Sequence, residues 1–65
     1  MAIHSNVTVP LEGEDGNAFA IIGRCMHLAR KAGLSREEIE EFRTEATEGD
    51  YNHLLQTVMK YFETE

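Results

Sequence analysis

The stretch AGLSREEIEEF, residues 32–42, decides the fold, because it ends one helix and begins another with almost no loop between them. Gly33 is typical of the residue after a helix, where a left-handed backbone conformation closes the last turn. Ser35 and Glu38 match the S-x-x-E capping box, in which each side chain accepts the backbone N–H of the other residue. The stretch therefore predicts two helices joined by a very short turn.

Upstream of this turn, residues 17–32 have the pattern of an amphipathic helix. Asn17 is a suitable N-cap, and Gly23 interrupts the helix at a cost of about 1 kcal/mol relative to alanine. We expect Gly23 to mark a close approach by another helix or by a ligand, and Arg24 to face away from the core. Apolar side chains recur at helical spacing, at Ala18, Ile21, Ile22, Cys25, Leu28, Ala29 and Ala32, and Phe19 and Met26 widen that face.

Downstream, two further helices are expected. Residues 36–48 carry a narrow apolar stripe of Ile39, Phe42 and Ala46 on an otherwise glutamate-rich surface. Gly49 ends this helix, and Asp50 caps the next one, over residues 51–62, which has a wide apolar face.

The first residues read as a strand. Residues 3–10 alternate between apolar and polar side chains and are rich in β-branched residues. Pro10 cannot donate a hydrogen bond to a sheet, so we expect the strand to end there. No second strand pattern follows, so the strand is predicted to pair with the same strand of another copy. The alternative is an arm that lies across the helices.

Together these elements predict a mainly α fold. Residues 1–65 form a single domain, in which one N-terminal β-strand precedes a compact set of three helices. A chain of 65 residues buries only about 60% of the surface that its unfolded chain exposes. Such chains commonly need additional stabilisation from a disulfide, a metal or a partner subunit. Cys25 has no partner for a disulfide, and the scattered histidines do not have the spacing of a metal site. We expect no metal and no cofactor. Association into a homodimer or larger assembly is the remaining source of this stabilisation, unless the monomer packs unusually well.

The charge of the chain bears on its partners. The formal net charge is −6, with 12 acidic and 6 basic residues, and an acidic chain repels the phosphate backbone of nucleic acids. We expect no nucleic-acid binding, unless the acidity itself mimics nucleic acid. No segment is long and apolar enough for a membrane span, and no secretory leader opens the chain. A single free cysteine suits a reducing compartment, so a cytoplasmic location is expected.

Catalytic signatures are missing from the sequence. Cys25 falls on the apolar face of its helix and is expected to be a buried side chain rather than a nucleophile. We therefore predict a binding protein and not an enzyme. Glutamates that repeat every fourth residue could present an acidic stripe to a basic partner protein, or could form a solvated surface; they are Glu37, Glu41 and Glu45.

A small anionic ligand, such as a nucleotide, is the leading expectation. The stretch GEDGNAF, residues 13–19, is a glycine-rich turn that opens a helix, and a helix N-terminus attracts anions. Against this site, the turn lacks the known phosphate-binding motifs, and three acids, Glu12, Glu14 and Asp15, stand where a phosphate would approach. Basic residues on the same helix complete the candidate site, which consists of Gly16, Asn17, Gly23, Arg24, His27 and Lys31.

Residues 11–62 carry three motifs, GEDGNAFAIIGR, G-[LV]-S-x-E-E-I-E-E-F and EAT-x-GDYNHLLQTVM. In these motifs the chain resembles a family of small bacterial and phage proteins without an established activity. The resemblance implies a phage or bacterial accessory protein, with counteraction of a host defence as one role. The last two helices are also similar to ubiquitin-associated-type three-helix domains, which bind proteins at positions that correspond to Gly33, Leu34, Val58 and Phe62.

Overall fold

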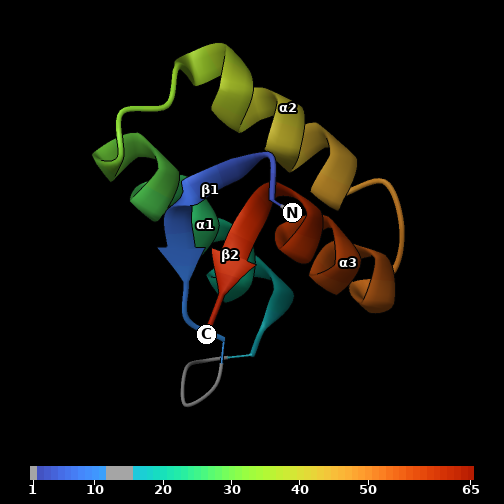
Figure 1. Ribbon diagram of the computed structural model, residues 1–65. Helices are drawn as coiled ribbons and strands as arrows, with labels where there is room; N and C mark the ends of the chain where they lie inside the picture. The colour runs from blue at the N-terminus through green and yellow to red at the C-terminus, as the bar shows by residue number, and fades with distance from the viewer. Residues whose placement is uncertain (1, 12–15) are drawn as a thin grey trace.

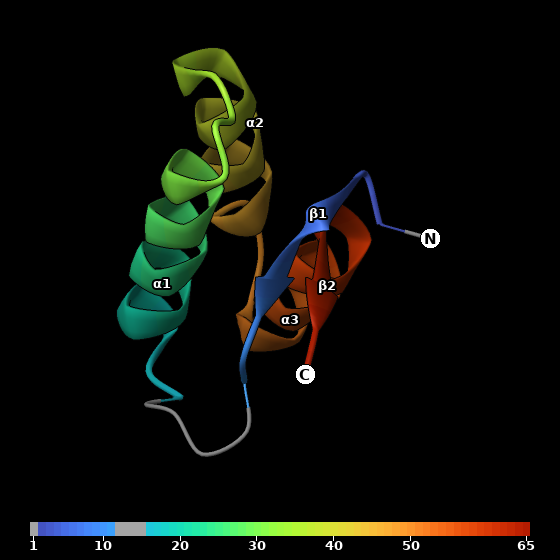
Figure 2. The ribbon, with the colours of Figure 1, turned by 60° about the vertical axis from the view of Figure 1, so that its left-hand side comes forward.

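The computed structural model describes residues 2–11 and 16–65, which form two layers around one core. One layer holds α1 (Ala18–Lys31) and α2 (Arg36–Ala46). The other holds β1 (His4–Val9), α3 (Tyr51–Tyr61) and β2 (Phe62–Thr64), as Figures 1 and 2 show. The three helices and the N-terminal strand are therefore confirmed. The predicted acidic turn at residues 12–15 lies outside the described residues.

Short polar side chains begin all three helices, as the sequence predicts. The side chain of Asn17 accepts the N–H of Phe19, and that of Asp50 accepts the N–H of His53. Ser35 and Glu38 form the complete capping box, with hydrogen bonds of 2.7 and 3.1 Å. Gly33 has a φ of 94°, which a glycine adopts without strain. These local signals fix where each helix starts and how sharply the chain turns.

The expectation that no second strand follows is wrong. α3 ends at Tyr61, and Phe62–Thr64 extend as β2. β2 pairs in parallel with β1, so the two strands that meet come from opposite ends of the sequence. The pairing therefore closes within one chain. Pairing of β1 with a second copy stays a prediction, for the edge of β1 opposite β2.

The parallel pair is irregular. His4 is opposite Phe62, while Thr8 is opposite Glu63 and Val9 opposite Thr64, so β1 bulges between His4 and Thr8. Two backbone bonds extend the pairing beyond the strands, from Ile3 N–H to the Lys60 carbonyl (3.0 Å) and from Glu65 N–H to the Val9 carbonyl (3.2 Å). The bulge breaks the predicted alternation, because Val7 and Val9 are buried whereas Ile3 and Ser5 are exposed.

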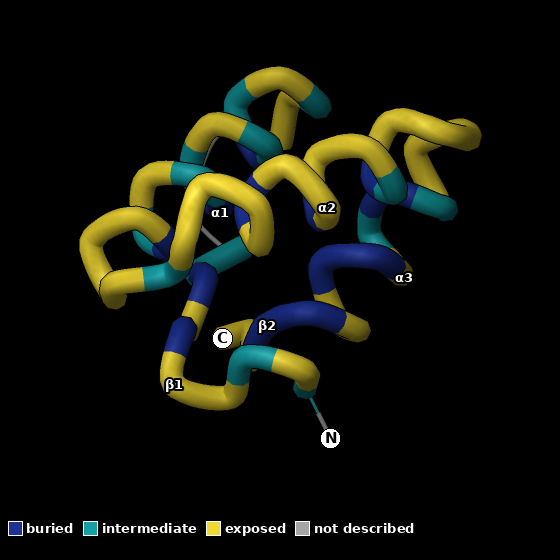
Figure 3. Tube along the Cα trace, turned by 90° about the horizontal axis from the view of Figure 1, so that it is seen from above, coloured by how far each residue is buried: buried dark blue, intermediate teal, exposed yellow. Residues whose placement is uncertain are grey.

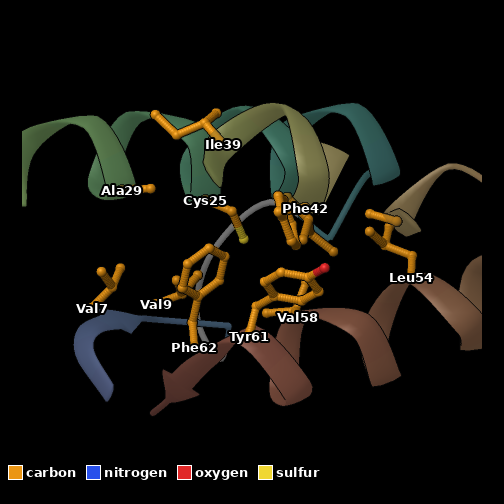
Figure 4. Close-up of a cluster of buried hydrophobic side chains, with 12 residues drawn as sticks. Val7, Val9, Cys25, Ala29, Ile39, Phe42, Leu54, Val58, Tyr61 and Phe62 are labelled. Carbon is orange, nitrogen blue, oxygen red and sulfur yellow. The ribbon is translucent and has the colours of Figure 1, made fainter. Parts of the chain in front are cut away.

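The core lies between the two layers (Figure 4). Its centre is aromatic: the ring centroids of Phe42 and Phe62 are 4.9 Å apart, and those of Phe42 and Tyr61 are 5.5 Å apart. Cys25 is buried against them, as expected from its place on the apolar face of α1. Figure 3 shows that each helix is buried along one side and exposed along the other. None of the described helices could span a bilayer.

Candidate functional site

The start of α1 is held by the fold on both sides of Asn17. The Asn17 side chain accepts the N–H of Phe19 at 2.9 Å. The carbonyl of Gly16 accepts a hydrogen bond of 2.5 Å from the hydroxyl of Tyr51 on α3. These two contacts cap α1 and fasten its first turn to α3.

Arg24 lies outside the buried core, as expected, but it contacts the chain that follows β1. Its side chain is partly buried, and its Nη1 donates to the carbonyl of Pro10 at 3.2 Å. The periodicity placed Arg24 on the polar side of α1, but the chain that follows β1 runs along that side. Arg24 therefore joins α1 to the end of β1.

His27 and Lys31 lie on the exposed side of α1, well away from its N-terminus. A helix rises 1.5 Å per residue, so Lys31 is about 20 Å along the axis from Asn17. Lys31 instead borders a shallow hollow of about 180 Å³ beside Asn6 and Thr8 of β1. The structure therefore does not bring the six candidate ligand-binding residues together at one place.

Gly23 is not approached by any other part of the described chain, and the expected close contact is absent within it. A Cβ added to Gly23 would find no heavy atom within 4 Å outside its own helix backbone. The outer side of α1 is consequently open at this position, and a molecule outside the chain could come close to the helix backbone there.

The three glutamates of the predicted acidic stripe on α2 have two kinds of environment. Glu37 and Glu41 are exposed. Glu45 instead accepts hydrogen bonds from Lys60 Nζ (2.6 Å) and the Tyr61 hydroxyl (2.9 Å), which lower the pKa of its carboxyl group. The stripe is thus interrupted, because Glu45 fastens α2 to α3.

Two further groups with shifted pKa values also belong to the fold. Burial raises the pKa of the Cys25 thiol to about 12, and the nearby Arg24 opposes this only in part. Burial, followed by the hydrogen bond to Glu45, raises the pKa of Tyr61 to about 12. A thiol with such a pKa is a poor nucleophile at neutral pH. No cluster of three or more His, Cys, Asp or Glu side chains within the described ranges is arranged to hold a metal ion.

The most unusual exposed feature is Phe19, at the start of α1. Its relative exposure is 84%, higher than that of any other large exposed apolar residue among those described. It borders an apolar pocket of about 260 Å³ between the first turn of α1 and the α2–α3 turn. We call this region the Phe19 surface; its apolar side chains are Ala18, Phe19, Ile22, Ala46, Tyr51 and Leu54.

The sequence contained part of the signal for this surface. Phe19 lies about 100° around the helix from Ala18, at the edge of the apolar face. Whether α2 and α3 cover that edge depends on how the helices pack, and the periodicity of one helix carries no information about it.

A larger hollow than the pocket beside Phe19 lies at the α1–α2 turn. It has a volume of about 530 Å³, and Leu34 and Ile39 line it together with Arg30 and Arg36. Within residues 2–11 and 16–65, neither guanidinium forms a hydrogen bond or an ion pair. Glu40 also lines the hollow but lies 3.8 Å from Arg43.

The protein-binding positions implied by the resemblance to ubiquitin-associated-type domains do not form a surface. Val58 and Phe62 are 0% and 1% exposed, because both belong to the core between the two layers (Figure 4). Comparisons with protein-family models, curated proteins and solved structures gave no match to this chain.

Proposed function

We propose that this chain is a non-catalytic binding protein that works by protein–protein contact through the Phe19 surface. The single observation that carries the proposal is the nearly complete exposure of Phe19 beside an apolar pocket. A phenylalanine that moves from water into an apolar contact contributes about 1.5–3 kcal/mol. Contiguous exposed apolar patches mark interaction sites, whereas apolar residues exposed singly are ordinary.

The pocket is also preorganised for binding. The Tyr51 hydroxyl fastens α3 to the Gly16 carbonyl, and Asn17 caps the turn that presents Phe19. A surface that is ordered before binding loses less conformational entropy when a partner docks. The residues on both sides of the pocket are therefore ordered before binding, and only the partner's side chain has to be ordered.

A binding role without catalysis fits the chemistry of the described titratable groups. Cys25 is buried and lines none of the three hollows described above, and the partly buried Glu45–Tyr61 pair joins α2 to α3. A catalytic site needs a nucleophile or an acid–base group within reach of a substrate pocket. The pocket beside Phe19 is lined mainly by apolar side chains, and the one carboxylate among its lining residues, Asp50, accepts the N–H of His53 as the cap of α3.

A peptide titration followed by amide NMR tests this proposal. Short polar peptides that contain one phenylalanine are expected to shift the signals of Ile22, Tyr51 and Leu54. Matched peptides with serine in place of the phenylalanine serve as the control ligand. On the protein, Phe19→Ser should weaken the response, whereas Met59→Ser, at a residue of 52% exposure on α3 outside the pocket, should not. Equal shifts with both peptides, or none, would contradict the proposal.

A second candidate function, the binding of a small anion, is favoured by the two arginines at the α1–α2 turn. Arg30 and Arg36 flank a hollow with apolar Leu34 and Ile39, and its volume of about 530 Å³ is within the usual size of ligand pockets. Guanidinium groups suit phosphate and carboxylate ligands. This site replaces the predicted one at Asn17, since the structure separates those residues.

Calorimetry with inorganic pyrophosphate and with a nucleoside triphosphate tests the anion site. Binding should be lost when Arg30→Gln and Arg36→Gln are combined. Arg43→Gln is the matched control, because Arg43 is an exposed arginine of the same helix as Arg36, α2, and does not itself line the hollow. No heat of binding up to about 1 mM ligand, the weak end of measurable affinity, would rule the site out.

A further inference from the structure

We infer that the partner at the Phe19 surface is a second copy of this chain, in a symmetric dimer whose two α1 helices cross in antiparallel fashion. This inference rests on the proposed function, because it names the occupant of the same surface. It differs from pairing through β1, since the contact lies on the opposite layer of the fold (Figure 2).

The shape of the outer side of α1 suits contact with itself. Phe19 and Gly23 are four residues apart, so they are neighbours on one face of the helix. Phe19 projects from the surface at 84% exposure, while no heavy atom of the described residues outside the helix backbone lies within 4 Å of a Cβ built on Gly23. The helix therefore carries a protruding ring and an open backbone position side by side, separated by about 6 Å along the axis.

A two-fold axis joins these two features reciprocally. In a symmetric dimer, the same pair of contacts occurs twice. When two α1 helices cross in antiparallel fashion midway between Phe19 and Gly23, the ring of each copy lies over Gly23 of the other copy. Glycine permits this close approach because it has no Cβ. Each Phe19 ring loses its exposure to water, and neither helix has to change its conformation.

The charge distribution favours a second copy as the occupant. The chain has 12 acidic and 6 basic residues, yet α1 carries three of the basic residues and no acidic residue. The α2–α3 turn beside the pocket carries the acidic residues Glu48 and Asp50. In the antiparallel crossing, the basic half of each α1, with Arg30, points toward the acidic turn of the other copy. Opposite charges therefore meet on both sides of the two-fold axis.

Sedimentation equilibrium of the purified full chain, from about 1 µM to 1 mM, tests the dimer. The chain is expected to dimerise, and Phe19→Ser is expected to raise the dissociation constant by roughly 100-fold or more, because two rings lose their burial. The matched control Met59→Ser removes a similarly exposed apolar side chain from α3 and should leave the dissociation constant unchanged.

A second variant separates the interface from folding. Gly23→Gln fills the open position with a residue of higher helix propensity, so the melting temperature at a concentration where the chain is monomeric should rise. The same change should weaken the dimer by roughly 10-fold or more, because the partner's ring loses its place. Opposite directions of these two effects cannot result from a folding defect.

Each outcome bears on a different statement. A wild-type chain that stays monomeric, or a dimer that tolerates both variants, overturns the inferred dimer. A dimer that Phe19→Ser weakens and Gly23→Gln does not overturns the antiparallel crossing. In all these cases the peptide titration still decides the proposed function by itself. If the dimer forms, the amide signals of Ile22 and Tyr51 should move on dilution without any peptide.

Discussion

Phe62 and Phe19 are phenylalanines with opposite surroundings. Phe62 is 1% exposed and contacts Phe42 with its ring centroid 4.9 Å away, whereas Phe19 is 84% exposed. Around Phe62, β1, β2, α2 and α3 close the core from both layers (Figure 4). Around Phe19, one side of α1 and a pocket remain open. The comparison separates residues that hold the fold from residues that are available to a partner.

The largest expected difference comes from truncating each of the two rings. Phe62→Ala should destabilise the fold by about 3–5 kcal/mol, because it leaves a cavity in a closed core. Phe19→Ala should change the free energy of unfolding of the monomer by no more than about 0.5 kcal/mol, as for other exposed sites. Urea denaturation at low protein concentration measures both values. Similar losses for the two variants would mean that Phe19 is packed within its own chain.

Two glycines, Gly49 and Gly23, show the same contrast between a closed and an open environment. A Cβ on Gly49 would lie 2.9 Å from the Cβ and the Cγ of His53. His53 cannot move away easily, because its Nε2 lies 2.8 Å from the Glu45 carbonyl oxygen. Gly49→Ala should therefore destabilise the chain by about 1–3 kcal/mol, as overpacking does. Thermal unfolding measures the change, and an unaltered melting temperature would show that the α2–α3 turn relaxes.

On the open side, the same substitution should have the opposite sign. Gly23→Ala adds a methyl group that no other described part of the chain approaches within 4 Å, and alanine is about 0.8–1 kcal/mol more favourable than glycine inside a helix. The monomer should become more stable by roughly this amount in a urea titration. A loss of stability would mean that the chain itself covers Gly23.

The smallest expected effect is a pH dependence of the stability, and it arises at Glu45, which joins α2 to α3. Hydrogen bonds from Lys60 and Tyr61 lower the pKa of Glu45 below its usual 4.5. A carboxyl group with a lower pKa in the folded state stabilises the fold above the unfolded pKa, and this contribution is lost as the pH falls through the folded pKa.

A matched variant isolates this contribution. The stability difference between the wild type and Glu45→Gln should be constant near neutral pH and shrink as the pH falls below about 4.5. Urea titrations at several pH values measure it. Glu37→Gln is the control, because that carboxyl group is exposed on the same helix. A difference that grows on acidification would contradict the lowered pKa.

Local chemistry made the helices predictable. Asn17, Ser35 and Asp50 each cap a helix where the sequence indicates one, because a cap depends on residues two or three positions away. The end of α3 was not predictable in this way. Tyr61 and Phe62 both continue the apolar face of a helix, and only pairing with β1, from the other end of the sequence, makes Phe62 extended.

The candidate site followed the same division. The sequence correctly placed Asn17 at a helix start and His27 and Lys31 on an exposed side. It could not show that Arg24 reaches the Pro10 carbonyl, since that contact depends on where β1 ends. Nor could it show that the pocket beside Phe19 opens between α1 and the α2–α3 turn, because three segments form it.

The pairing of β1 with β2 also has a consequence for the synthesis of this protein on the ribosome. β1 leaves the ribosome before the three helices, whereas its partner β2 and the buried Phe62 emerge after them. Val7 and Val9, which the finished core buries, therefore stay exposed to water while the rest of the chain is made. A nascent chain arrested before Phe62 should be sensitive to proteases at β1, and a chain long enough to expose β2 outside the ribosome should be protected.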